Sequence, residues 1–153
     1  MASTINASTS PTTGIITTAD SSGNLELQNN GTTALSLQSG KVINPSVTNY
    51  TETAYTANTS TAITVSLSNG TVQILTLTAN ATITMPTAGA GKSFIIFLRQ
   101  DATGSRTVTW TTVKWAGGTA PTITSTASKQ DIFSFFSDGT SWYGVTVGQN
   151  YTA

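Results

Sequence analysis

Short runs in which apolar and polar residues alternate recur along most of this chain. Three of them follow one another in the middle of the sequence, over Ile63 to Leu67, Val72 to Thr78 and Ala81 to Met85. A period of two places successive side chains on opposite faces of a strand. Threonine, with 33 of the 153 residues, is β-branched and favours the same structure. Because no helical apolar period extends beyond two turns, we expect an all-β fold.

The second half of the chain holds nearly all of its aromatic residues. Ten of the 12 Phe, Trp and Tyr residues lie between Phe94 and Tyr151. The run Ser93 to Leu98 is apolar at both alternating sets of positions, which predicts a central strand that is covered on each face. We therefore expect residues 61–153 to form a C-terminal domain, a β-sandwich or barrel-like module of short antiparallel strands.

Turn-forming pairs predict how some of these strands are joined. Asn69-Gly70 predicts a hairpin between the runs on either side of it, and Asp138-Gly139 predicts another between residues 131–137 and 141–147. Pro86 is expected to end the strand over residues 81–85, because proline cannot donate to a strand ladder.

Residues 1–49 are expected to form an N-terminal arm and a β-meander, followed by a polar linker over residues 50–60. Residues 1–13 have no apolar period, and three short alternating runs follow within residues 14–19, 25–28 and 34–37. None of these runs contains an aromatic residue, and a ribbon of two or three strands is marginally stable alone in water. We therefore predict that this region docks on other chains and forms a homotrimer. The contacts are expected from the apolar residues of the runs: Ile15, Ile16, Leu25, Leu27, Leu35 and Leu37.

The absence of cysteine and histidine excludes many kinds of functional site. No Cys/His zinc site and no imidazole or thiolate catalysis is possible. The six Lys and Arg residues are scattered, which argues against nucleic acid as a partner, and no apolar run approaches the ~20 residues of a membrane span. The N-terminus also lacks a secretory signal.

Two further patterns suggest enzymatic sites but have simpler explanations. Residues 86–93 end like a phosphate-binding loop, yet Pro86 stands where the pattern needs glycine and a strand-like run follows. The six acidic residues lie mostly in turn sequences, and none is marked as half of a catalytic carboxylate pair. We expect no enzymatic activity, catalytic residue, metal site or cofactor.

Four aromatic residues are candidates for ligand or subunit contact: Trp110, Trp115, Trp142 and Tyr143. Aromatic rings on a shallow β-surface can stack on sugars, but the same rings can build the core or an interface. The sequence leaves both interpretations open.

Two stretches of the chain carry a family resemblance. Residues 14–35, GIITTADSSGNLELQNNGTTAL, are similar to N-terminal segments of bacteriophage virion proteins, particularly from phages of aquatic bacteria and cyanobacteria. Residues 97–110, FLRQDATGSRTVTW, resemble the C-terminal module of such proteins, as do VKWAGGTAPT at residues 113–122, DIF at 131–133 and SDGTSWYG at 137–144. The resemblance implies a non-enzymatic virion component, commonly a homotrimer without a cofactor, that is assembled in the cytoplasm of the bacterial host.

Two locations on the virion fit this resemblance. A compact domain held by an N-terminal arm favours a decoration, or cement, protein that docks on the major capsid protein outside the head. The alternative is a short tail fibre or receptor-binding tip that joins a tail or baseplate component and contacts host surface glycans.

Overall fold

The computed structural model describes residues 28–29, 32–33 and 48–153. Asn49–Ala153 form one compact unit. In the N-terminal region, β1 (Gln28–Asn29) and β2 (Thr32–Thr33) pair antiparallel. The six residues that we expect to make docking and trimer contacts, Ile15, Ile16, Leu25, Leu27, Leu35 and Leu37, lie outside the described residues.

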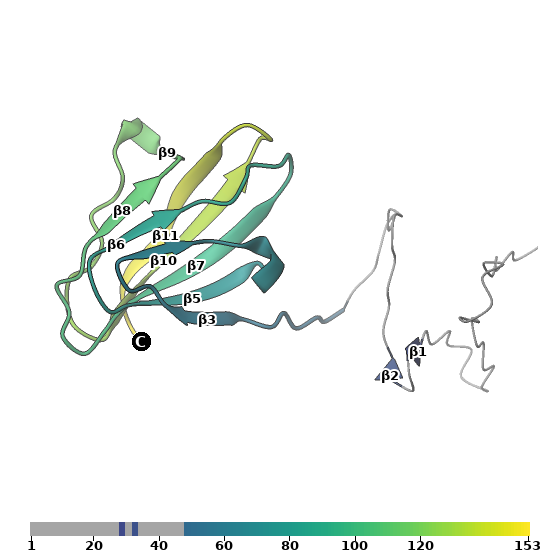
Figure 1. Cartoon of the computed structure of the whole chain (residues 1–153), viewed down its shortest axis with the longest axis horizontal. Helices are drawn as coiled ribbons and strands as arrows, with labels where there is room; N and C mark the ends of the chain where they lie inside the picture. Colours follow the sequence, from purple (N-terminus) through teal and green to yellow (C-terminus); the bar gives the residue numbers. More distant parts are fainter. Residues whose placement is uncertain (1–27, 30–31, 34–47) are drawn as a thin grey trace, which may run out of the picture. The chain divides into compact units, whose positions relative to one another are not determined.

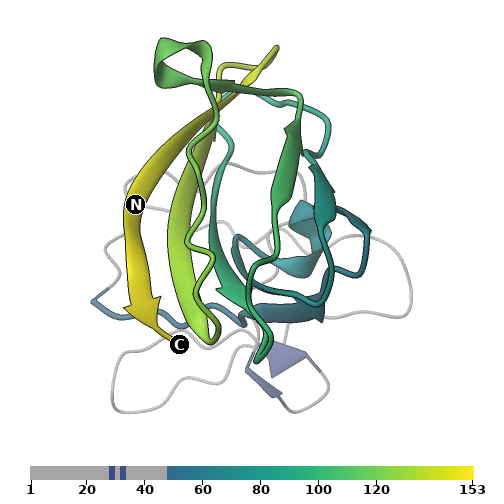
Figure 2. The same cartoon turned by 90° about the vertical axis from the view of Figure 1, so that its left-hand side faces the viewer.

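The compact unit consists of two sheets. The six-stranded sheet contains, in spatial order, β3 (Tyr55–Asn58), β5 (Val72–Leu77), β7 (Ser93–Gln100), β10 (Lys129–Ser137), β11 (Trp142–Thr152) and β9 (Val113–Trp115). The three-stranded sheet contains β4 (Ala62–Thr64), β6 (Ala81–Thr84) and β8 (Val108–Thr111). Figures 1 and 2 show the two sheets as layers, with β8 and β6 on one side and β10 and β11 on the other. The expectation of an all-β fold is confirmed.

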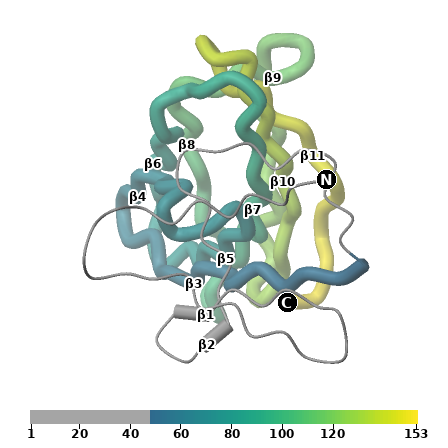
Figure 3. The backbone as a smooth tube through the Cα atoms, turned by 90° about the vertical axis from the view of Figure 1, so that its right-hand side faces the viewer, coloured from purple at the N-terminus to yellow at the C-terminus, as the bar shows by residue number. Residues whose placement is uncertain are grey.

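The chain alternates between the two sheets from β3 to β8. Strands β3, β5 and β7 enter the larger sheet, and β4, β6 and β8 enter the smaller one. Each strand therefore returns to its own sheet in the same direction, and the neighbours in these two sets pair in parallel. The backbone tube in Figure 3 follows this winding.

The expected antiparallel pairing is correct only for part of the sheet. Strand β10 pairs antiparallel with both β7 and β11, so the predicted hairpin at Asp138-Gly139 is confirmed. The hairpin predicted at Asn69-Gly70 is wrong, because β4 and β5 belong to different sheets. A single turn of 3-10 helix, η1 (Leu67–Asn69), occupies this position.

Local hydrogen bonds explain why the chain changes sheet at η1. Ser66 caps the turn by accepting a hydrogen bond from the backbone of Ser68. The buried side chain of Gln73 donates to the carbonyls of Ser66 and Gly70 at 2.8 and 3.1 Å. The Gln73 amide thus satisfies two backbone carbonyls that receive no hydrogen bond from a neighbouring strand. At Asn69-Gly70 the chain therefore crosses from the smaller sheet to the larger one and does not form a hairpin.

Aromatic and aliphatic side chains fill the space between the sheets. Phe94 stacks on Phe135 with 4.9 Å between ring centroids and meets Trp142 edge-on at the same distance. Leu75, Leu77, Ile83 and Ile96 are also fully buried in this cluster. Each of these strands therefore contributes alternate residues to a single core.

Two predictions about individual segments are corrected by this arrangement. Strand β7 lies inside its sheet, but it is not covered on both faces, because Phe94, Ile96 and Leu98 are buried while Ile95 is 36 % exposed. Residues 55–58, which we expected in a polar linker, form β3 and pair with β5. Sequence composition missed β3 because its polar residues face outward.

Helices contribute little to the described structure. It contains η1 and one other 3-10 turn, η2 (Ala116–Gly118), in which Gly117 and Gly118 adopt positive φ. No helix with the length and apolar character of a membrane span occurs in the part of the chain that the structure describes.

Candidate binding surface

The three tryptophans lie in the core region. Trp142 is 1 % exposed, and its indole N–H donates to the carbonyl of Pro86 at 2.7 Å. Trp110 and Trp115 are partly buried, and their rings pack against Phe133 and Phe135. Of the four aromatic residues singled out from the sequence, Tyr143 is the exposed one, at 41 %.

Tyr143 belongs to the outward face of the six-stranded sheet, which the smaller sheet does not cover. Strand register places it directly beside Phe136 of β10 and Lys114 of β9. Phe136, which is 51 % exposed, is in turn opposite Ser93 of β7. We call these four residues, Lys114, Tyr143, Phe136 and Ser93, the aromatic row.

Apolar residues continue on this face in the next rows. Val145, Ser134, Ile95 and Val72 form a second row across β11, β10, β7 and β5. Ile132, Phe97 and Ile74 form a third row. Neither of these rows carries a charge. The outward face is therefore an apolar strip on a chain with few charged residues, and such strips commonly mark interaction sites.

Polar contacts hold the ring of Tyr143 in a defined orientation. Its hydroxyl donates to the Asp138 carboxylate at 2.9 Å, and the Lys114 ammonium lies 5.6 Å from the ring centroid. The backbone N–H groups of Ser141 and Thr140, followed by the Tyr143 hydroxyl, lower the pKa of Asp138. The same hydrogen bond, reinforced by the negative charge, raises the pKa of Tyr143. An exposed ring that is fixed before binding loses little conformational entropy when a ligand stacks on it.

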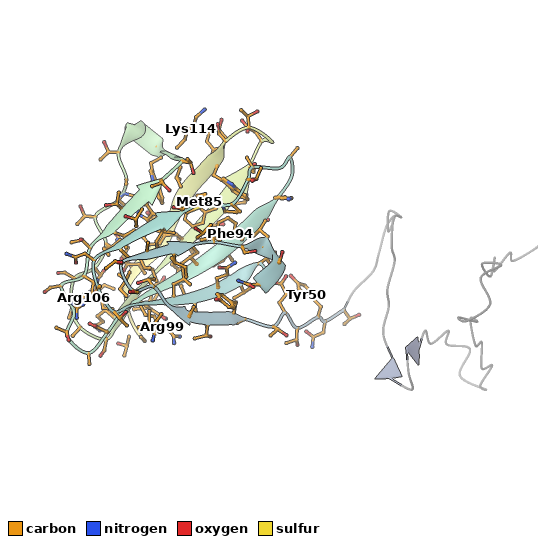
Figure 4. The ribbon with its side chains drawn as sticks, viewed as in Figure 1. Tyr50, Met85, Phe94, Arg99, Arg106 and Lys114 are labelled. Atoms are coloured by element: carbon orange, nitrogen blue, oxygen red, sulfur yellow. The ribbon has the colours of Figure 1, made fainter. Side chains whose placement is uncertain are left out.

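An open cavity of about 620 Å³ adjoins the aromatic row. The segment before β3 forms one wall with Tyr50 and Glu52, and Ser93, Ser134 and Phe136 line the other. Tyr50 is 73 % exposed and lies ahead of β3 (Figure 4). Glu52 accepts a hydrogen bond from the hydroxyl of Thr71. The cavity thus combines two aromatic rings with hydroxyl groups and one carboxylate.

The end of the compact unit opposite Lys114 is polar, and hydrogen bonds and an ion pair hold its charged side chains. The Arg99 guanidinium donates to the side chain of Gln130 at 2.8 Å. Arg106 forms a 2.8 Å ion pair with Asp101, and this hydrogen bond is the largest cause of the lowered pKa of Asp101. Figure 4 shows Arg99 and Arg106 at the opposite end of the unit from Lys114. The outward face therefore has distinct aromatic and polar ends.

The described carboxylates serve as structural acceptors. Buried Asp131 accepts hydrogen bonds from the backbone of Thr124 and Asn150 at 2.7 and 2.9 Å and from the Gln149 side chain. Asp101 and Asp138 accept from backbone N–H groups in their own turns. Within the described ranges, no three Asp and Glu side chains gather where they could hold a metal ion.

Sequence reasoning missed Phe136 and Tyr50 as surface candidates. The signal for Phe136 is its position next to Phe135, because two consecutive residues of a strand must point to opposite faces. The neighbouring residue Phe135 is fully buried. Tyr50 carried no such signal, since its exposure depends on how residues 49–54 approach β5.

The comparisons with known proteins identify a family for most of the compact unit. Residues 45–142 match the family model described as "Putative phage tail fibre C-terminal domain". This match covers more than half of the chain and includes most of the compact unit. Neither the search of curated proteins nor the search of solved structures found a match. The chain belongs to the phage tail fibre C-terminal domain family and is thus a structural component of the virion.

Proposed function

We propose that this protein is a short tail fibre whose C-terminal unit forms a receptor-binding tip that contacts host surface glycans. The observation that carries the proposal is the pair of neighbouring exposed rings, Phe136 and Tyr143, on a sheet face that the other described strands leave uncovered. The tail-fibre family match favours this role over the docking on the capsid exterior that we first expected.

The chemistry of the aromatic row fits a saccharide. Sugars present C–H groups on their ring faces and hydroxyl groups at their edges, so an aromatic ring and nearby polar groups recognise them together. Tyr143 is already oriented by Asp138 and Lys114. The hydroxyls of Ser93 and Ser134 and the carboxylate of Glu52 line the adjoining cavity and supply hydrogen-bond partners.

The proposal includes an assembly and an attachment. The protein acts as a homotrimer, and residues 1–49 attach it to a tail or baseplate component. Support comes from the sequence, because the three apolar runs in this region have no aromatic residues and are too narrow to form a core alone. In this role the protein needs no cofactor, metal or catalytic residue.

Glycan binding is tested with the full chain on an array of bacterial surface polysaccharides, followed by titration with the polysaccharide that binds best. Phe136→Ala and Tyr143→Ala should each weaken binding by about 10-fold, equivalent to ~1.4 kcal/mol. A hot-spot aromatic residue typically contributes at least this much.

A variant that retains the aromatic ring, Phe136→Tyr, is the matched control for this experiment. It should keep most of the affinity, because it preserves the stacking surface. If no polysaccharide binds, or if Phe136→Ala and Tyr143→Ala bind like the natural chain, the glycan-binding role is excluded.

A further inference from the structure

Among the described strands, β11 has no partner along most of one edge. It pairs with β9 only through Trp142, Tyr143 and Gly144. Beyond this point, residues 145–152 make no backbone hydrogen bond on the side away from β10 to any other described segment. Residues 145–152 lie opposite only the six residues 129–134 of β10, so at ~3.3 Å per residue this edge is about 20 Å long. Such an edge is a template for pairing with another strand.

The edge lacks most of the features that usually protect such strands. Natural edge strands are protected by charges, proline, short length or bulges. No charged residue and no proline occurs from Trp142 to Ala153. The irregularities that it does carry are two register shifts in the pairing around Ile132 and the positive φ of Asn150. By contrast, the edges of the smaller sheet are short, with three residues in β4 and four in β8.

The side chains along this edge are apolar and exposed. Val145, Val147 and Tyr151 are 50 %, 57 % and 45 % exposed. The ring of Tyr151 lies over Gly148, where an added Cβ would meet the tyrosine hydroxyl. These side chains would gain burial if another strand were placed beside β11.

We propose that the free edge of β11, residues 145–152, pairs with a strand of a second copy of this chain. A second copy suits the edge because it presents the edge of β3, which among the described strands pairs with β5 alone and carries no charge. No charge repulsion therefore opposes the contact. Pairing of β11 with β3 of the next copy is compatible with a closed homotrimer and does not require a bound glycan.

The first test compares two lysine substitutions in the full chain. Val147→Lys introduces a charge on the free edge, and Thr109→Lys, on the exposed surface of β8, is the matched control. We expect the natural chain and Thr109→Lys to have the same oligomeric mass by light scattering. Val147→Lys should fall to the mass of one copy while its far-UV circular dichroism stays unchanged. A monomeric natural chain, or an unchanged oligomeric mass in Val147→Lys, would overturn the proposal.

Disulfide cross-linking provides a second test, which does not depend on the lysine variants. The chain has no cysteine, so each engineered thiol is the only one present. Mixed samples of Val147→Cys and Thr56→Cys should form mixed cross-links, because β11 of one copy pairs with β3 of the next. Val147→Cys alone should form no cross-link, because two β11 edges that pair with each other would close a dimer instead of a homotrimer. The mixed product supports the proposal, whereas its absence or a cross-link of Val147→Cys alone contradicts it.

Loss of polysaccharide binding and loss of self-association are separable results. Val147→Lys that becomes monomeric should still bind polysaccharide through each single tip, although with less avidity. Conversely, Phe136→Ala should retain its oligomeric mass.

Discussion

The two faces of strands β7, β10 and β11 have similar apolar character but different surroundings. On the inner face, Phe94, Phe135 and Trp142 are almost completely buried and contact one another. On the outer face, Phe136 and Tyr143 retain about half of their exposure. The same backbone therefore supports a closed core on one side and an uncovered apolar surface on the other.

This difference separates stability from recognition within a single sheet. A buried side chain contributes its transfer free energy to folding, whereas an exposed ring has that free energy available for a partner. Substitutions on the inner face should therefore change the free energy of unfolding, and substitutions on the outer face should change binding. Three experiments on stability test this comparison.

The largest difference is expected between the neighbouring phenylalanines of β10. Phe135→Ala should lower the free energy of unfolding by about 3–5 kcal/mol, because it leaves a cavity among packed rings. Phe136→Ala should change it by less than about 1 kcal/mol, because this ring is 51 % exposed. Urea unfolding followed by tryptophan fluorescence measures both values. Equal losses would show that the outer face is as tightly packed as the inner one.

A smaller difference is expected between two adjacent residues of β11. Gly144 points to the inner face, where an added Cβ would lie 2.5 Å from the Trp115 ring. Gly144→Ala should therefore destabilise the protein by about 1–3 kcal/mol through overpacking. Val145→Ala, on the outer face, is the control and should cost less than about 1 kcal/mol. Thermal unfolding of both variants gives the comparison, and an unaffected Gly144→Ala would contradict the close approach.

The smallest effect is expected from the polar contact on the outer face. Tyr143→Phe removes the hydroxyl that bonds Asp138 and should lower the thermal midpoint slightly at neutral pH. The folded-state pKa of Asp138 is lowered. Its ionised carboxylate therefore contributes to the free energy of unfolding above the ordinary aspartate pKa of about 4, and this contribution is lost as the pH falls through the lower pKa of the folded state. The folded-state pKa of Tyr143 is raised. Its protonated hydroxyl therefore contributes to the free energy of unfolding below about pH 10, and this contribution is lost as the pH rises through the higher pKa of the folded state.

The difference in midpoint between the natural chain and Tyr143→Phe should consequently be greatest between about pH 4 and 10 and should narrow on both sides. Comparing the two proteins at each pH cancels the titration of Asp101, which both retain. A constant difference from acid to alkaline pH would show that the hydroxyl acts without the Asp138 charge.

The sequence by itself determined several of the strands and one hairpin. The alternation in residues 81–85 and 131–137, the stop at Pro86 and the turn at Asp138-Gly139 all agree with the structure. These features are local, because side-chain direction in a strand and the geometry of a tight turn depend on neighbouring residues. The apolar residues on both faces of β7 were also visible in the sequence.

Only the tertiary structure decided how the strands combine and which faces remain open. Asn69-Gly70 leads to another sheet, residues 55–58 become β3, and the three tryptophans pack with the core. Phe136 is left outside although it is as apolar as Phe135. The physical reason is that a strand's hydrogen bonds and apolar face can be satisfied by any compatible strand, near or distant in sequence. The choice therefore depends on the packing of the whole unit.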